Sequence, residues 1–372
     1  MGQRTLAWPM AALLSALIVY ASLYPFDGWR LSGQPPWAFL TAPLPRYWTW
    51  FDVLSNWLGY VPLGFLCVLV ALRSGASRLG WWLLVLYPSL LSLLMETVQG
   101  YLSARVSSNV DWMLNSAGGV MGAGLAWGLS RTTAMQRWQR WRGHWFEADA
   151  HGALVLLALW PAALLYPTPL PFGVGQVGWM VYATAAQTLE GTGLAHWLPV
   201  VLEDPRPLSP LFQAVCMALL LLAPCLLGYS VLRGTTRRAL LLVVVVGGSV
   251  VVEGLSAALT YGPAHAWKWL TPPAVLALGM VMVLGLLSAS LSRRACVVWL
   301  VWVLLTGLAL LNSSPATPYF AESLQVWAQG RFIRFHGVTQ WLGWLWPYVA
   351  MVHAAAHISG RRAVRLDTRL QD

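Results

Sequence analysis

The chain has 372 residues, of which 58% are hydrophobic and only 10% are charged. A soluble domain of ordinary composition carries about 25% charged residues, so these values exclude a soluble enzyme, a disordered chain and a secreted disulfide scaffold. The net charge of +10 comes from short basic clusters between apolar runs, which is typical of membrane orientation signals and not of nucleic-acid binding. The composition therefore predicts an all-α polytopic membrane protein.

Ten apolar segments follow one another along the chain, and we expect each to cross a bilayer as a helix. They cover roughly residues 6–24, 53–72, 79–97, 111–130, 152–167, 209–232, 239–260, 272–291, 295–312 and 339–358. The first segment has no small-residue cleavage site before Pro25, so we expect it to be retained. The segments group as four, four and two (4 + 4 + 2), which divides the chain into residues 1–145, 146–292 and 293–372.

The basic residues predict the orientation. Of the 23 Lys and Arg residues, 16 fall on one side of the ten segments and seven on the other. Because basic residues favour the cytoplasmic side, both termini are predicted to be cytoplasmic, an N-in, C-in arrangement. The long loops 25–52, 168–208 and 313–338 then lie outside and are expected to fold onto the membrane surface.

Basic residues and tryptophans alternate between Arg137 and Trp145, after the fourth segment. This pattern is typical of a short helix lying at the headgroup level over anionic lipid. Membrane lipids are therefore predicted partners, whereas no nucleic-acid partner is expected.

Five polar residues lie at the end of the third segment, in the loop that follows and at the start of the fourth: Glu96, Gln99, Arg105, Asp111 and Asn115. Ionic groups inside a bilayer are costly and often functional, and the connecting loop is short enough to bring these side chains together at the outer membrane boundary. One interpretation is a structural clasp, in which Arg105 pairs with Asp111 and Asn115 bonds to the third helix. The other is a binding site for a polar headgroup, with Arg105 on an anion. The residues alone favour neither.

Glycines follow this polar cluster in the fourth segment, at positions 118, 119 and 122. A stripe of small residues lets another helix backbone approach closely. We therefore expect Gly118, Gly119 and Gly122 to pack against a neighbouring helix.

An internal repeat is indicated when residues 95–129 are aligned without gaps to residues 252–286. The alignment pairs Glu96 with Glu253, and it also pairs two tryptophans and two sets of glycines. The second copy has lost most of the polar cluster, because Lys268, Pro272 and Gly262 replace its Asp, Asn and Arg. Only Glu253 remains. We expect Lys268 to pair with Glu253 or with an acid of the first copy, and the alternative is that a hydrogen bond between helices satisfies Glu253.

The second segment carries Asn56, Pro62, Gly64 and Phe65, in the spacing Asn-x5-Pro-x-Gly-Phe. Together with the Glu-x2-Gln, Arg and Asp-x3-Asn described above, this spacing resembles the VanZ-like family over about residues 20–130. The resemblance implies a four-helix bacterial membrane module, in which Asn56, Pro62 and Gly64 serve helix packing. The family is named for a protein linked to resistance against the glycopeptide teicoplanin, and it brings no established catalytic activity.

Other reactive side chains give weaker signals. The four cysteines lie in or beside apolar runs and are interpreted as apolar fillers. His353 and His357 stand four residues apart, a spacing that can hold a metal, but no third ligand is near in sequence. Their position close to the end of the last segment explains them without a metal. No metal and no cofactor are predicted.

The leading hypothesis is a non-enzymatic protein of the bacterial inner membrane. It would recognise or handle a lipid-linked component of the cell envelope through the five polar residues, with a link to glycopeptide antibiotic tolerance. One alternative is a membrane-embedded hydrolase or transferase that uses Glu96 or Asp111 as a general base. The other is a structural partner of other membrane proteins in an envelope or polysaccharide assembly.

Overall fold

A computed structural model describes most of the chain. It covers residues 7–24, 26, 28–31, 33, 35–44, 50–103, 105–166, 168–193, 196, 208–313 and 333–369. Within these residues the secondary structure is helical, with two isolated β-bridges and no strand. The contacts divide the chain into two compact units, residues 1–141 and residues 142–372.

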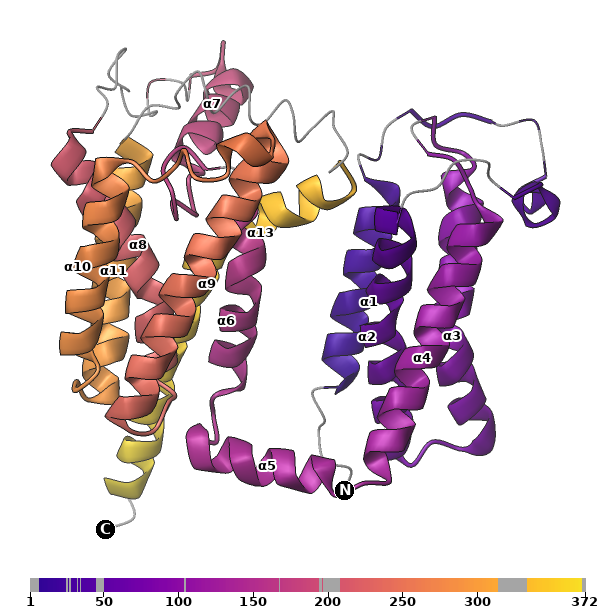
Figure 1. Cartoon of the computed structure of the whole chain (residues 1–372), viewed down its shortest axis with the longest axis horizontal. Helices are drawn as coiled ribbons and strands as arrows, with labels where there is room; N and C mark the ends of the chain where they lie inside the picture. Colours follow the sequence, from indigo (N-terminus) through magenta and orange to yellow (C-terminus); the bar gives the residue numbers. More distant parts are fainter. Residues whose placement is uncertain are drawn as a thin grey trace. The chain divides into compact units, whose positions relative to one another are not determined.

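Unit 1 is a helical bundle (Figure 1). Its helices are α1 (Ala7–Leu23), α2 (Trp50–Ser74), α3 (Arg78–Gln99) and α4 (Asn109–Ser130), with the short 3-10 helix η1 (Ala38–Thr41) between α1 and α2. Helix α2 lies against each of the other three long helices, and α3 lies against α1 and α4. Small buried clusters of apolar side chains fill the space between them.

The α2–α4 contact is the closest in unit 1, and glycines make it possible. A Cβ atom on Gly118 would overlap the carbonyl oxygen of Trp57, and one on Gly122 would overlap that of Val61. From the other side, a Cβ atom on Gly64 would overlap the carbonyl of Gly119. The two backbones therefore touch directly, as small-residue stripes allow in membrane helices.

Unit 2 is a larger helical bundle built around α8 (Pro210–Tyr229). The helices that contact α8 are α6 (His151–Leu164), α9 (Thr235–Tyr261), α10 (Pro272–Ser288) and α11 (Arg293–Ser313). The remaining elements are α7 (Gly178–Leu189), the 3-10 helix η3 (Pro263–His265) and α13 (Ile333–Arg369). Helix α5 (Ala134–Trp145) contains the stretch predicted to lie at the membrane interface. The division of the chain into the two units falls within this helix, after Trp141.

Each of the ten expected segments contains a helix. Five of the described helices are long and apolar enough to cross a membrane: α2 from Asp52 onward, α3, α8, α9 and α11. Helices α1, α6 and α10 are apolar but shorter, with 10 to 17 residues each.

The loop after α6 differs from the expectation of a surface loop. Residues 172–175 are buried inside unit 2, where Phe172 packs edge-on against Trp269 with ring centroids 5.5 Å apart. The backbone of Gly175 donates to the Gly343 carbonyl at 2.7 Å, and its own carbonyl accepts from the Tyr348 hydroxyl at 3.0 Å. Buried non-helical backbone is tolerated in a membrane protein only where protein groups bond its polar atoms. The two bonds of Gly175 meet this requirement.

Two further differences concern helices that extend beyond the predicted segments or lie outside them. Helix α7 forms within the stretch 168–208 that was expected to be a loop, and α13 continues well past the predicted end at residue 358. Apolar patterning detects membrane spans, so it does not detect helices that continue into polar surroundings. Most of the expected outer loop 313–338 lies outside the described residues.

Candidate functional site

The five predicted site residues lie where three helix ends of unit 1 meet. Glu96 is in the last turn of α3 and Asn115 is in α4, and both are buried, with 4% and 5% of their surface exposed. Gln99, Arg105 and Asp111 are half-buried. The third end belongs to α1, which sequence analysis did not include in the site.

Glu96 fixes the start of α4. Its Oε2 atom accepts the backbone N–H of Ser108 at 2.8 Å, and its backbone carbonyl accepts the hydroxyl of Ser107 at 2.6 Å. Ser108 in turn is the N-cap of α4, because its hydroxyl accepts the N–H of Asp111 at 3.3 Å. The Glu96 carboxylate is thereby held in a defined position by the loop that it supports.

Arg105 and Gln99 bind the C-terminal end of α1. One guanidinium nitrogen of Arg105 donates to the carbonyls of Ala21 and Tyr24, at 3.1 and 2.7 Å. The Gln99 amide donates to the carbonyl of Ser22 at 3.0 Å. The last carbonyls of a helix lack partners within the helix and carry partial negative charge, so a cation is stabilised there.

Two buried side-chain amide atoms in unit 1 have no hydrogen-bond partner among the described residues. Asn115 donates from Nδ2 to the hydroxyl of Ser92 on α3 at 2.9 Å, but its Oδ1 accepts nothing. The Nδ2 atom of Asn56 on α2 is also buried and donates to nothing. Unsatisfied buried polar atoms are rare in folded proteins and call for an explanation. One donor on α2 and one acceptor on α4 thus remain without a partner among the described residues.

Several contributors to this region carried no sequence signal. Ser92, Ser107 and Ser108 are common residues at unremarkable spacings, and the carbonyls of α1 belong to a helix 70 residues or more away. Tyr60 is also buried here and interacts with Ser92 through its side chain. Only tertiary contact brings these groups to the cluster.

In unit 2 the acid that aligns with Glu96 is Glu253, and its hydrogen-bond partner is a backbone group of a loop. Its Oε1 accepts the backbone N–H of Phe172, in the buried loop, at 2.6 Å. Phe172 has a positive φ of 63°, a conformation that L residues rarely adopt. Lys268 is exposed and forms no ion pair among the described residues.

An acidic residue lies beside the histidine pair. The ring of His357 lies 3.6 Å from Asp149, measured from Nδ1 to Oδ2. Within the part of the chain that the structure describes, no group of three or more His, Cys, Asp or Glu side chains is placed to hold a metal ion.

A comparison with protein families identifies residues 7–131 as VanZ/LLP1. Residues 7–131 are a VanZ-like domain. This range includes α1 to α4 and all the predicted site residues, so the resemblance based on Asn56, Pro62 and Gly64 is confirmed. No curated protein and no solved structure matches the chain. The VanZ-like domain and the long apolar helices together make the chain a membrane protein.

Proposed function

We propose that the protein crosses the bacterial inner membrane several times and uses its VanZ-like domain to recognise a lipid-linked component of the cell envelope. In the proposed topology of ten spans with cytoplasmic termini, the loop between α3 and α4 lies at the outer boundary of the membrane, where the headgroups of such lipids lie. The unpartnered amide atoms of Asn56 and Asn115 carry this proposal.

The chemistry of the cluster suits a polar headgroup. Asn56 offers a donor and Asn115 offers an acceptor, while half-buried Arg105 adds a fixed positive charge near the boundary. Arg105 and Glu96 are already held by backbone groups, so the site is organised before a ligand arrives. Organisation of this kind reduces the entropy lost on binding.

Asn56→Leu is the sharpest test. The substitution keeps the side-chain size and removes a nitrogen that makes no hydrogen bond, so a purely structural cluster should tolerate it or become more stable. We expect it to reduce binding of an undecaprenyl phosphate probe to the purified full-length protein about tenfold, and to raise teicoplanin sensitivity in a strain that depends on the protein.

Ser55→Ala is the matched control, because the Ser55 hydroxyl donates to the Asp52 carbonyl of its own helix and to no other helix among the described residues. It should leave binding and teicoplanin sensitivity unchanged. If Asn56→Leu behaves like Ser55→Ala in both assays, the cluster is a structural clasp and the proposal fails.

We include in the same proposal an internal repeat, in which residues of unit 1 correspond to residues of unit 2. In the ungapped alignment Glu96 corresponds to Glu253, and each accepts a backbone N–H. Gln99 corresponds to Ser256, and each donates to a carbonyl near the end of the first helix of its unit, α1 or α6. These parallel bonds support common ancestry, with the second copy acting as a scaffold.

A further inference from the structure

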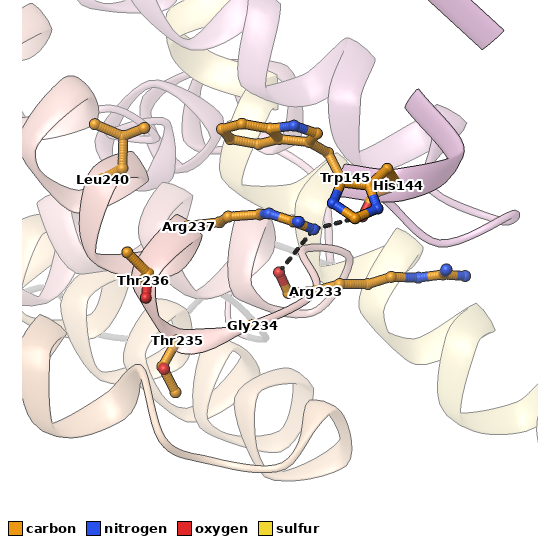
Figure 2. A pocket seen from close by; sticks show the side chains of 8 residues that line it. All are labelled: His144, Trp145, Arg233, Gly234, Thr235, Thr236, Arg237 and Leu240. Carbon is orange, nitrogen blue, oxygen red and sulfur yellow. Dashed lines mark hydrogen bonds between the residues drawn. The ribbon is translucent and has the colours of Figure 1, made fainter. Parts of the chain in front are cut away.

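An open pocket of about 820 Å³ lies at one end of unit 2. It is formed by the end of α5, the turn between α8 and α9, and the first turns of α9 (Figure 2). His144 and Trp145 line one part, and Arg233, Thr235, Thr236 and Arg237 line another. The pocket therefore combines a cation, hydroxyl groups and an aromatic ring at the level where the apolar part of α9 begins.

Arg237 is the cation that faces the pocket. It donates to the carbonyls of His144 and Arg233, and its guanidinium lies 5.0 Å from the centre of the Trp145 ring. Figure 2 shows its side chain running beneath that ring, whereas the guanidinium of Arg233 points away from Thr235. Arg233 binds Glu147 at 2.8 Å, and Arg293 binds the same carboxylate.

The local charge balance favours an anion. Glu147 is shared between two arginines, and Arg237 has only neutral carbonyl partners among the described residues. A guanidinium held by carbonyls and an aromatic face keeps its charge and its remaining N–H groups for a ligand. Phosphate oxygens are the acceptors that arginine binds best.

The first turn of α9 adds donors on the same side. Its N-cap is Gly234, with a φ of 86° and no side chain to accept a bond. Thr235 and Thr236 are exposed beside it. The first N–H groups of a helix have no partner within the helix, and they stabilise negative charge together with the helix dipole.

Beyond the pocket, α9 presents a continuous apolar face. Leu240 lines the pocket and is half exposed, and Val243, Val244 and Val251 follow it with 57 to 64% of their surface exposed. Gly247 and Gly248 lie between them, with open space where a Cβ would be. Inorganic phosphate has no apolar part to contact this surface, whereas the acyl chain of a lipid can lie along it.

We propose that this pocket binds an anionic phospholipid, with the phosphate on Arg237 and the first turn of α9, and an acyl chain along Leu240, Val243 and Val244. The site belongs to unit 2, so it is separate from the headgroup site proposed for the VanZ-like domain.

The test uses the full-length protein in phosphatidylcholine-containing detergent micelles, titrated with fluorescent phosphatidylglycerol. Arg237→Gln should weaken binding about tenfold, which is the expected effect of losing a charge-assisted phosphate contact. Arg294→Gln is the matched control, because Arg294 is an exposed arginine outside the pocket. It removes the same charge and should change affinity less than twofold.

Thr236→Glu separates binding from folding. A carboxylate in the first turn stabilises a helix, so this variant should unfold no earlier than the wild type, yet its charge should repel the phosphate and weaken binding at least as much as Arg237→Gln.

Three results would overturn the proposal. The first is equal loss in Arg237→Gln and Arg294→Gln, which indicates general charge attraction. The second is unchanged binding in Thr236→Glu. The third is displacement of the lipid by inorganic phosphate at the same concentration as by unlabelled phosphatidylglycerol, which indicates a site for free phosphate.

Discussion

At the scale of single residues, the packing of helices in the VanZ-like domain depends on the positions of its glycines. Gly118 and Gly122 stand one turn apart on α4 and face the backbone carbonyls of α2, whereas Gly124 on the same helix has open space around it. Glycine is therefore needed at some positions of this glycine-rich helix and is only permitted at others.

Gly122→Ala should destabilise unit 1 by about 1–3 kcal/mol, because the added methyl group forces α2 and α4 apart. Gly124→Ala should stay within about 1 kcal/mol of the wild type or gain stability, since alanine is the better helix former. Thermal unfolding of the two purified variants measures the difference. Equal unfolding temperatures would contradict the backbone contact between α2 and α4.

In unit 2, the contribution of an arginine to stability likewise depends on its position, and Arg238 is the example. It is buried, and one of its nitrogens donates to the carbonyls of Ala289 and Leu291, just past the end of α10, at 3.0 and 2.6 Å. We expect Arg238→Met to lower the free energy of unfolding by about 2–3 kcal/mol, because buried carbonyls lose charged donors. Arg294 is an exposed arginine, and its replacement by Met should change the free energy of unfolding by no more than about 0.5 kcal/mol. Denaturant unfolding followed by circular dichroism distinguishes the two.

At the scale of elements, the buried loop of unit 2 depends on Glu253. Glu253→Gln keeps an oxygen that accepts the N–H of Phe172, whereas Glu253→Leu leaves that N–H buried without a partner. The Leu variant should therefore be less stable than the Gln variant by about 1–3 kcal/mol. Thermal unfolding of the pair is the measurement, and a Leu variant as stable as the Gln variant would show that the bond contributes little.

The sequence was sufficient to predict most of the elements but few of the contacts between them. Apolar runs predicted a helix in every range where one occurs between α8 and α11, because a helix that enters lipid must be apolar over its length. The carbonyls that bind Arg105, and the N–H that binds Glu253, belong to distant segments. Backbone groups are alike in every residue, so no pattern of side chains reveals which of them will be the partner.

At the scale of the whole molecule, the proposed arrangement has ten spans and cytoplasmic termini. The four cysteines are buried, so single cysteines introduced at the surface can be labelled with little background. Ser290→Cys lies in the turn between α10 and α11, and Gly193→Cys follows α7. Both positions are exposed.

A membrane-impermeant maleimide added to intact cells with a permeabilised outer membrane should label Gly193→Cys. It should leave Ser290→Cys unmodified until the inner membrane is opened, because the positive-inside rule places the turn at Ser290 in the cytoplasm. The reverse labelling pattern would invert the topology, and it would move the Glu96 and Arg105 cluster to the cytoplasmic side.

The burial of α8 has a consequence for how the protein is made. The ribosome completes α8 before α9, α10 and α11, the helices that later enclose it. The face of α8 that receives α11, where the Cys216 thiol meets the Gly307 carbonyl at 3.5 Å, stays uncovered until residue 313 has been translated. A nascent chain that stalls before α11 therefore offers an incomplete helix bundle to membrane quality-control proteases, because the packing around α8 is completed only after its last neighbouring helix has been synthesised.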